Sequence, residues 1–261
     1  MKTLLICHED APLDREVLAR WLASFSDLVG LIILEERPQR RWNRIKREIS
    51  RVGPIRFLDV LAFRLYYKLR LRPRDKEWEC ETVTRLCDVY RKLADDTPIL
   101  KTHSPNSSQA EQFLREAQPD IVIARCKAIL KPSVYSIARD GTFVMHPGVC
   151  PEYRNAHGCF WAMAERDYSR VGMTLLRVDA GVDTGPVYGY FSYPYDASRE
   201  SHIVIQHRVV LENLDRIREA LVAIHEHRAV PIDTAGRRSR AWGQPWLTRY
   251  LRIRSEAKRQ L

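Results

Sequence analysis

Two short apolar runs end abruptly in polar turns, and this pattern constrains the fold more than any other feature of the chain. Thr142–Met145 is followed by His146-Pro147-Gly148, and Gly172–Val178 is followed by a loop that contains Asp179 and Asp183. Runs of this length and composition predict buried β-strands. In open α/β folds the ligand crevice lies beyond the carboxyl ends of the strands. We therefore expect the imidazole of His146 at that edge of a sheet.

The loop after the second run contains two glycines and two carboxylates. Such a loop can bring an acid against the imidazole and fix its tautomer and charge. We predict that His146 and Asp183 form the chemical centre. Asp183 could instead have a purely structural role, because Asp and Gly residues form turns without any catalytic function. We interpret Asp179 mainly as such a turn residue.

The flanking segments alternate between strand and helix patterns. Thr3–Cys7 and Leu28–Leu34 predict buried parallel strands, with a helix over Asp14–Ser24 between them. The first turn lacks G-x-G-x-x-G, so no dinucleotide site is expected. Further strands are predicted at Ile99–Thr102, Ile121–Ala124 and Gly185–Ser192, and helices at Glu79–Ala94, Ser107–Ala117, Ala156–Glu165 and Ser201–His227. We predict one α/β domain over residues 1–227 with a mostly parallel twisted sheet, and a short basic C-terminal extension over 228–261.

A helical insertion, about residues 37–96, interrupts this alternation. Between Arg37 and Lys76, fourteen Lys and Arg residues stand against three acidic ones. Trp42, Ile45, Ile49 and Val52 recur at helical intervals, and Gly53-Pro54 should end that helix. One interpretation is a covering helix with solvated arginines whose stems lie on apolar surface. The other is a basic amphipathic hairpin that binds an anionic membrane or phosphates.

The composition of the chain indicates which cellular environment and which binding partners to expect. The formal net charge of +10 favours anionic partners such as phosphorylated substrates, RNA or a membrane face. Six cysteines without C-x-x-C spacing indicate reduced thiols and no metal site. The apolar run Leu4–Cys7 is too short for a secretory signal, and no run is long enough to span a bilayer. A cytoplasmic location is expected.

The motif H-P-G-V-C-P-E-Y-R, followed by a strand and D-A-G-V-D-T-G-P, resembles the folate-dependent formyltransferases. That family includes glycinamide ribonucleotide, methionyl-tRNA and amino-sugar formyltransferases. The resemblance covers roughly Gln118–Gly189 and is absent over about Arg37–Thr97. It implies a formyltransferase-type Rossmann-like fold and a formyl group taken from 10-formyltetrahydrofolate. The acceptor would be the amine of a small phosphorylated molecule, such as a nucleotide-linked amino sugar. The tail is too short for a second domain that grips tRNA, so tRNA is not expected as a partner.

The resemblance also implies roles for individual residues. His146 and Asp183 match the family's catalytic His and Asp. The segment Lys127, Ala128, Ile129 and Leu130 matches part of the pterin pocket, to which we also assign Asp179. For Ile129 and Leu130, plain core packing is the alternative. Candidates for binding the acceptor are Arg154, Asn155 and His157; Arg154 could meet an acceptor phosphate or the folate glutamate.

The sequence departs from the family pattern at Val144, where relatives have an asparagine two positions before the His. Loss of one oxyanion donor typically costs about 10²–10³ in rate. Asn155 or His157 could supply a substitute donor. Alternatively, the protein hydrolyses 10-formyltetrahydrofolate or performs related acyl chemistry. A third alternative is a folate-fold protein without turnover that docks on a membrane or RNA through its basic insertion.

Overall fold

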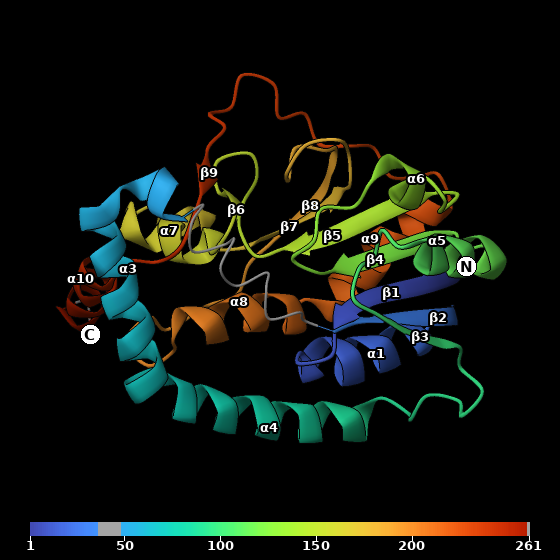
Figure 1. Cartoon of the computed structure of the whole chain (residues 1–261), viewed down its shortest axis with the longest axis horizontal. Helices are drawn as coiled ribbons and strands as arrows, with labels where there is room; N and C mark the ends of the chain where they lie inside the picture. The colour runs from blue at the N-terminus through green and yellow to red at the C-terminus, as the bar shows by residue number, and fades with distance from the viewer. Residues whose placement is uncertain (36–47, 260–261) are drawn as a thin grey trace.

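A seven-stranded sheet in the order β3-β2-β1-β4-β5-β7-β8 forms the centre of the molecule (Figure 1). The structure, a computed structural model, describes residues 1–35 and 48–259. The strands from β3 to β5 run parallel, whereas β7 pairs antiparallel with β5 and with β8. The predicted fold class, an α/β fold with a mostly parallel sheet, is confirmed. The strands are β1 Lys2–His8, β2 Asp27–Leu34, β3 Ile99–Thr102, β4 Ile121–Arg125, β5 Gly141–His146, β7 Met173–Arg177 and β8 Val187–Phe191.

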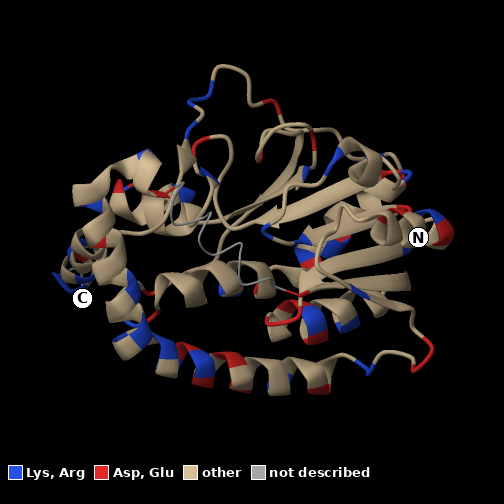
Figure 2. Ribbon diagram, in the orientation of Figure 1, with Lys and Arg blue, Asp and Glu red and all other residues tan. Residues whose placement is uncertain are grey.

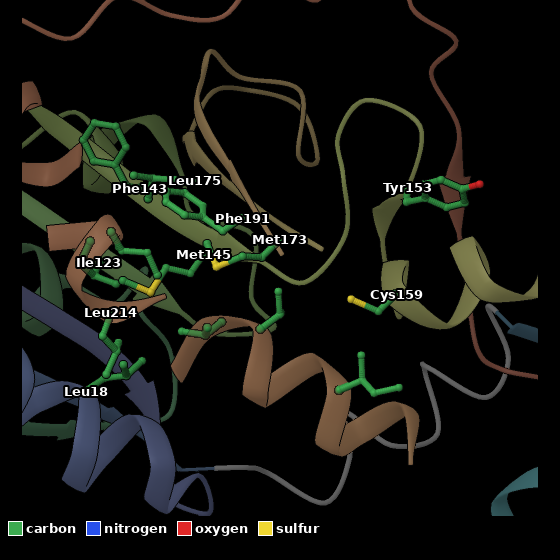
Figure 3. Packing of buried hydrophobic residues seen from close by; sticks show 14 of the residues in the cluster. Leu18, Ile123, Phe143, Met145, Tyr153, Cys159, Met173, Leu175, Phe191 and Leu214 are labelled. Atoms are coloured by element: carbon green, nitrogen blue, oxygen red, sulfur yellow. The ribbon is translucent and has the colours of Figure 1, made fainter. Parts of the chain in front are cut away.

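Helices cover both faces of this sheet because its strands are apolar on both faces. In β1, Leu5 and Cys7 face one core cluster while Leu4 and Ile6 face the other. The first cluster receives side chains from the helices α1 (Ala19–Ala23), α7 (Gly158–Ala164), α8 (His202–Leu211) and α9 (Leu214–His225). The second receives side chains from α5 (Ser108–Ala117). Figure 3 shows part of the first cluster, where Met145 of β5 lies among residues of β4, β7 and β8.

The helices and helical turns follow the chain in this order. They are η1 Leu13–Leu18, α1 Ala19–Ala23, α3 Pro54–Tyr66, η2 Tyr67–Leu71, α4 Arg72–Val89, α5 Ser108–Ala117, α6 Pro132–Tyr135, α7 Gly158–Ala164, η3 Tyr168–Arg170, α8 His202–Leu211, α9 Leu214–His225 and α10 Leu247–Arg259. Among the described helices, none has the length and apolar character needed to cross a bilayer.

Two predicted helices differ from the observed ones. The expected closing helix Ser201–His227 is split at Asn213, whose side-chain amide donates to the carbonyl oxygens of Val209 and Ser192. These bonds satisfy a helix end and tie it to the end of β8. The expected helix Glu79–Ala94 begins earlier, at Arg72, and ends at Val89. It starts earlier because the turn η2 joins it to α3 without a break.

The described part of the insertion forms a long helical arch along the outside of the molecule (Figure 1). Trp42 and Ile45 lie outside the described residues. Gly53 has φ +80° and α3 begins at Pro54, so the predicted break between two helices is present. Phe57, Val60 and Phe63 of α3 are buried against the body of the protein.

The C-terminal segment, which we predicted as a basic extension, packs against the rest of the fold. Its short strand β9, Ala241–Trp242, pairs in parallel with β6, Arg154–Asn155, in a second, two-stranded sheet. Tyr250 and Ile253 of α10 are buried in the first core cluster. Residues after 228 therefore contact the segment that follows His146.

Candidate active site

His146 and Asp183 meet at the carboxyl end of β5. His146 is the last residue of the strand, and its Nδ1 lies 3.5 Å from Oδ2 of Asp183. The side chains are 5% and 14% exposed. With so little solvent around it, a contact between an imidazole and a carboxylate is screened only weakly. The contact that we predicted between these two side chains is present in the structure.

The second ring nitrogen of His146 is held by the backbone. Its Nε2 lies 2.9 Å from the carbonyl oxygen of Tyr153, which can only accept a hydrogen bond, so Nε2 carries the proton. The turn between them requires glycine at position 148. A Cβ there would lie 2.5 Å from the Tyr153 carbonyl oxygen and 2.9 Å from Nε2 of His146. The H-P-G motif thus allows the close approach that fixes the imidazole.

The strand β6 holds the acidic loop in place. The backbone N–H of Asn155 donates to Oδ2 of Asp183 at 2.7 Å, and Nη1 of Arg154 donates to the carbonyl oxygen of Val182 at 2.7 Å. Asp183 has φ +52°, a left-handed conformation that Asp tolerates better than most residues. Arg154 and Asn155 therefore position Asp183 in this structure.

Asp179 stabilises its own loop. Its Oδ1 accepts from the backbone N–H of Gly181 at 2.9 Å and from the hydroxyl of Thr184 at 2.7 Å. These contacts match the interpretation of Asp179 as part of the turn. They leave its assignment to the folate site as a prediction.

The segment predicted to form the pterin pocket lies at the carboxyl edge of β4, next to the end of β1. The backbone N–H of Lys127 donates to Nε2 of His8 at 3.1 Å. Asn106 holds the loop from the other side, because it donates to the carbonyl oxygen of Ile129 and accepts from the backbone N–H of Lys131. Ala128 is half-buried in this loop. The backbone from 127 to 131 is thus fixed at the same sheet edge as His146.

The two apolar residues of this segment have different environments. Ile129 is 66% exposed, whereas Leu130 is 6% exposed and packs in the second core cluster. The Leu130 side chain matches the core alternative that the sequence left open. Ile129 remains available to a ligand.

Asn155 and His157 have partners within the protein. The side-chain amide of Asn155 donates to the carbonyl oxygen of Trp242, and Nδ1 of His157 lies 3.1 Å from Oε1 of Gln206 in α8. Burial lowers the pKa of His157 to about 4, so the ring is neutral near pH 7. As a neutral ring beside α8, His157 contributes no charge to the site.

The His146–Asp183 pair lies in a segment that matches a family model. The model of the formyl transferase family matches residues 72–214. The chain belongs to the formyl transferase family. The two motifs that carry His146 and Asp183 lie inside the matched region.

Curated relatives match a smaller part of the chain. The methionyl-tRNA formyltransferase of Chlorobium limicola is 34% identical over 88 residues, which are 34% of this chain and 27% of the relative. That of Pelobacter propionicus is 28% identical over 140 residues, or 53% of this chain and 43% of the relative. The chain therefore spans less than half the length of these relatives.

Solved structures share the fold at low sequence identity. Phosphoribosylglycinamide formyltransferase from Anaplasma phagocytophilum gives a TM-score of 0.55 at 13% identity and covers 94% of this chain and 99% of its own. A sugar N-formyltransferase from Shewanella sp gives 0.54 at 12% identity and covers 93% and 77%. At such identities the likeness shows the fold alone.

Within this formyl transferase fold, Val144 lies on the same face of β5 as His146, two residues earlier. Its side chain is half-buried and packs against the cluster of Cys150, Leu176 and Val187. Because valine has no polar group, its presence in place of the family's asparagine leaves apolar surface near the imidazole.

Sequence reasoning missed three supports of the site. Thr174, opposite His146 on β7, accepts from the backbone N–H of Cys150 and donates to the carbonyl oxygen of Gly148. A polar residue inside the apolar run Gly172–Val178 was the available sign. Trp242 stacks on Tyr153 with ring centroids 5.8 Å apart. Nothing in the basic tail pointed to that contact.

The third support is a buried ion pair at the end of β4. Nε of Arg125 lies 2.9 Å from Oδ1 of Asp14, and its Nη1 donates to the carbonyl oxygen of Met145 at 2.6 Å. Both side chains are about a tenth exposed. Arg125 thereby fixes the backbone immediately before His146.

A hollow in the described part of the chain lies away from this pair. It measures about 290 Å³ and lies between α4 and α8, with Trp78, Arg85 and Leu211 in its lining. It contains neither member of the His146–Asp183 pair. The pair is the stronger candidate for chemistry, because its imidazole and carboxylate lie 3.5 Å apart within motifs that the family model matches.

Proposed function

We propose that the chain transfers a formyl group from 10-formyltetrahydrofolate to the amine of a small acceptor. The proposal rests on one observation, the 3.5 Å contact between His146 and Asp183 at the carboxyl end of β5 in a member of the formyl transferase family. Formyl transfer needs a group that stabilises negative charge on the formyl oxygen and a route for the proton that the amine loses.

The bound folate would supply the electrophilic formyl carbon. Asp183, the more exposed of the two side chains, would accept the proton of the attacking amine directly or through water, and the leaving folate nitrogen would take up a proton as its bond to the formyl carbon breaks. His146 lies between the Tyr153 carbonyl oxygen and the Asp183 carboxylate, and these oxygens accommodate a proton on each ring nitrogen. A charged imidazole would stabilise the oxyanion by its proximity.

The backbone of residues 127–129 would hold the pterin. In support, this loop is fixed by Asn106 at the sheet edge that carries His146, and Ile129 is exposed there. The rigid, partly apolar surface suits a flat heterocycle. Leu130 would support the loop from the core.

The acceptor that we propose is a phosphorylated amino compound, such as a nucleotide-linked amino sugar. The net charge of +10 favours an anionic acceptor. A sugar N-formyltransferase and a phosphoribosylglycinamide formyltransferase share the fold, and both names describe small phosphorylated or sugar acceptors rather than RNA. Arg154, at the mouth of the acidic loop, is our candidate for the acceptor phosphate.

The test is a formylation assay with 10-formyltetrahydrofolate and a panel of nucleotide-linked amino sugars, read by mass spectrometry. We expect one acceptor to gain a formyl group and the folate product to appear in equal amount. A second arm without acceptor measures released formate. Val144, which lacks the family's amide, favours hydrolysis as the second candidate. If formate is released without acceptor as fast as folate product forms with acceptor, the activity is hydrolysis rather than transfer. If neither arm shows a reaction, both transfer and hydrolysis are excluded.

A further inference from the structure

The helix α3 and the following turn η2 carry a stripe of exposed aliphatic side chains. Spacings of three and four residues place these side chains on one side of the helix. We call them the leucine stripe: Ile55 (82% exposed), Leu58 (65%), Leu61 (42%), Leu65 (59%) and Leu69 (64%). At a rise of 1.5 Å per residue the stripe is about 20 Å long. A surface helix normally has a polar outer face, and this one does not.

The opposite side of α3 is already used for folding. Phe57, Val60 and Phe63 are buried, and the ring of Phe63 packs against Phe160 of α7 and Tyr250 of α10 at 6.0 and 5.3 Å between centroids. The leucine stripe is therefore not the side of α3 that packs against the core. It is a second apolar side, left outside the body of the protein.

Basic side chains accompany the stripe. From Pro54 to Arg74 there are six basic residues and one acid, Asp59, whose carboxylate accepts from the backbone and hydroxyl of Thr248. Lys68, Arg70 and Arg72 are exposed and form no salt bridge within the described residues. Figure 2 shows Lys and Arg along α3, η2 and the neighbouring α10. The surface is thus apolar and cationic together.

We propose that this surface docks the protein on an anionic lipid bilayer. A helix in the plane of such a bilayer buries its apolar side among the acyl chains while its cations meet the headgroup phosphates. A second copy of the chain fits less well, because it would set one row of unpaired cations against another. The phosphates of RNA would pair with the arginines, but RNA would not bury the exposed leucines. The lipid surface satisfies both features, and it is independent of the chemistry at His146.

The experiment is sedimentation of the full chain with vesicles of phosphatidylcholine alone and of an equimolar mixture with phosphatidylglycerol. We expect pelleting with the mixed vesicles, weakening as salt is raised, and little pelleting with the neutral ones. The variant Leu58→Ser/Leu65→Ser/Leu69→Ser should reduce the partition coefficient by roughly a hundredfold, because the removed side chains supply the buried apolar area. Arg70→Gln/Arg72→Gln should reduce it by about tenfold or more.

Matched controls replace equally exposed residues outside the surface. Val89→Ser/Val230→Ser removes exposed aliphatic side chains, and Arg91→Gln/Lys92→Gln removes two charges from the segment just after the end of α4. Both should pellet like the unaltered chain. Circular dichroism checks that every variant is folded.

Four outcomes would overturn the proposal. Absence of pelleting with anionic vesicles would exclude a membrane site, and pelleting unaffected by the leucine variant would mean that charge alone is responsible. In sedimentation equilibrium, self-association that the leucine variant abolishes, without vesicle binding, would assign the surface to a second copy. A gel shift with RNA that depends on Arg70 and Arg72, again without vesicle binding, would assign it to nucleic acid.

Discussion

Tyr153 directs its carbonyl oxygen to Nε2 of His146 at 2.9 Å while its ring stacks on Trp242. Trp242 in turn stacks on Trp161 with centroids 4.6 Å apart, and its indole N–H donates to the carbonyl oxygen of Glu152. The C-terminal segment therefore contacts the residue that fixes the imidazole. The position of His146 depends on residues almost a hundred positions later in the chain.

The first prediction concerns Trp242. Trp242→Ala should lower the free energy of unfolding by about 3–5 kcal/mol, because it leaves a cavity between Tyr153 and Trp161. At a temperature where the variant is still folded, its kcat should fall more than its KM changes, because His146 loses its fixed orientation. Trp242→Phe should restore most of both values. Trp78→Ala, at the distant α4, is the control; an equal loss of kcat there would contradict a role for Trp242 in positioning.

The second prediction concerns the pair itself. His146→Ala and Asp183→Asn should each reduce formyl transfer by about 10²–10⁴, the usual contribution of a general acid or base. Both variants should keep the circular dichroism of the unaltered chain. The matched controls His103→Ala and Asp215→Asn change exposed residues on other elements. Single-turnover rates like those of the unaltered protein, in either variant of the pair, would remove His146 and Asp183 from the chemistry.

The third prediction concerns Val144. Val144→Asn places an amide on the face of β5 that carries His146, and a donor to the oxyanion is worth about 10²–10³ in rate. We expect kcat to rise, with a stability cost of roughly 1–3 kcal/mol for an amide in an apolar cluster. Val144→Leu, which adds no donor, should leave kcat unchanged. A folded Val144→Asn protein without higher kcat would show that another group already meets the oxygen.

The fourth prediction concerns His157 and acid. Burial depresses the pKa of His157 to about 4 in the folded protein, against 6.5 for the ordinary side chain. The unfolded chain therefore binds a proton more readily, and stability is lost as the pH falls from about 6.5 towards 4. His157→Asn should flatten this part of the profile. Urea unfolding at several pH values measures the effect, with His103→Asn as the exposed control; parallel profiles for His157→Asn and the unaltered chain would refute it.

Most of the sheet could be predicted from the sequence. Buried strands such as Ile121–Arg125 are short apolar runs bounded by turns, and the H-P-G motif located the end of β5. The division of the closing helix could not be predicted, because it depends on bonds from Asn213 to Ser192, which is distant in sequence. The early start of α4 likewise depends on η2, where helical periodicity continues past Pro73.

The candidate site was predictable where local motifs determine it and not where tertiary contacts do. His146 and Asp183 stand out because each follows an apolar run and shares a motif with glycine. Arg125 and Trp242 carry no such mark, and Thr174 shows only as a polar residue inside an apolar run, although each of the three holds part of the site. For Leu130 and Asn155, the sequence motif predicts the position in the loop but not the direction of the side chain, because packing in the folded protein decides that direction.

The pairing of β6 with β9 has a consequence for the order of events during synthesis. A ribosome releases His146 and Asp183 well before Trp242, so the growing chain holds both side chains of the pair while the neighbouring strand β9 is still missing. We expect the nascent protein to be inert until those late residues emerge. Premature termination anywhere before position 241 would yield a chain that has the formyl transferase motifs but lacks the strand that braces them.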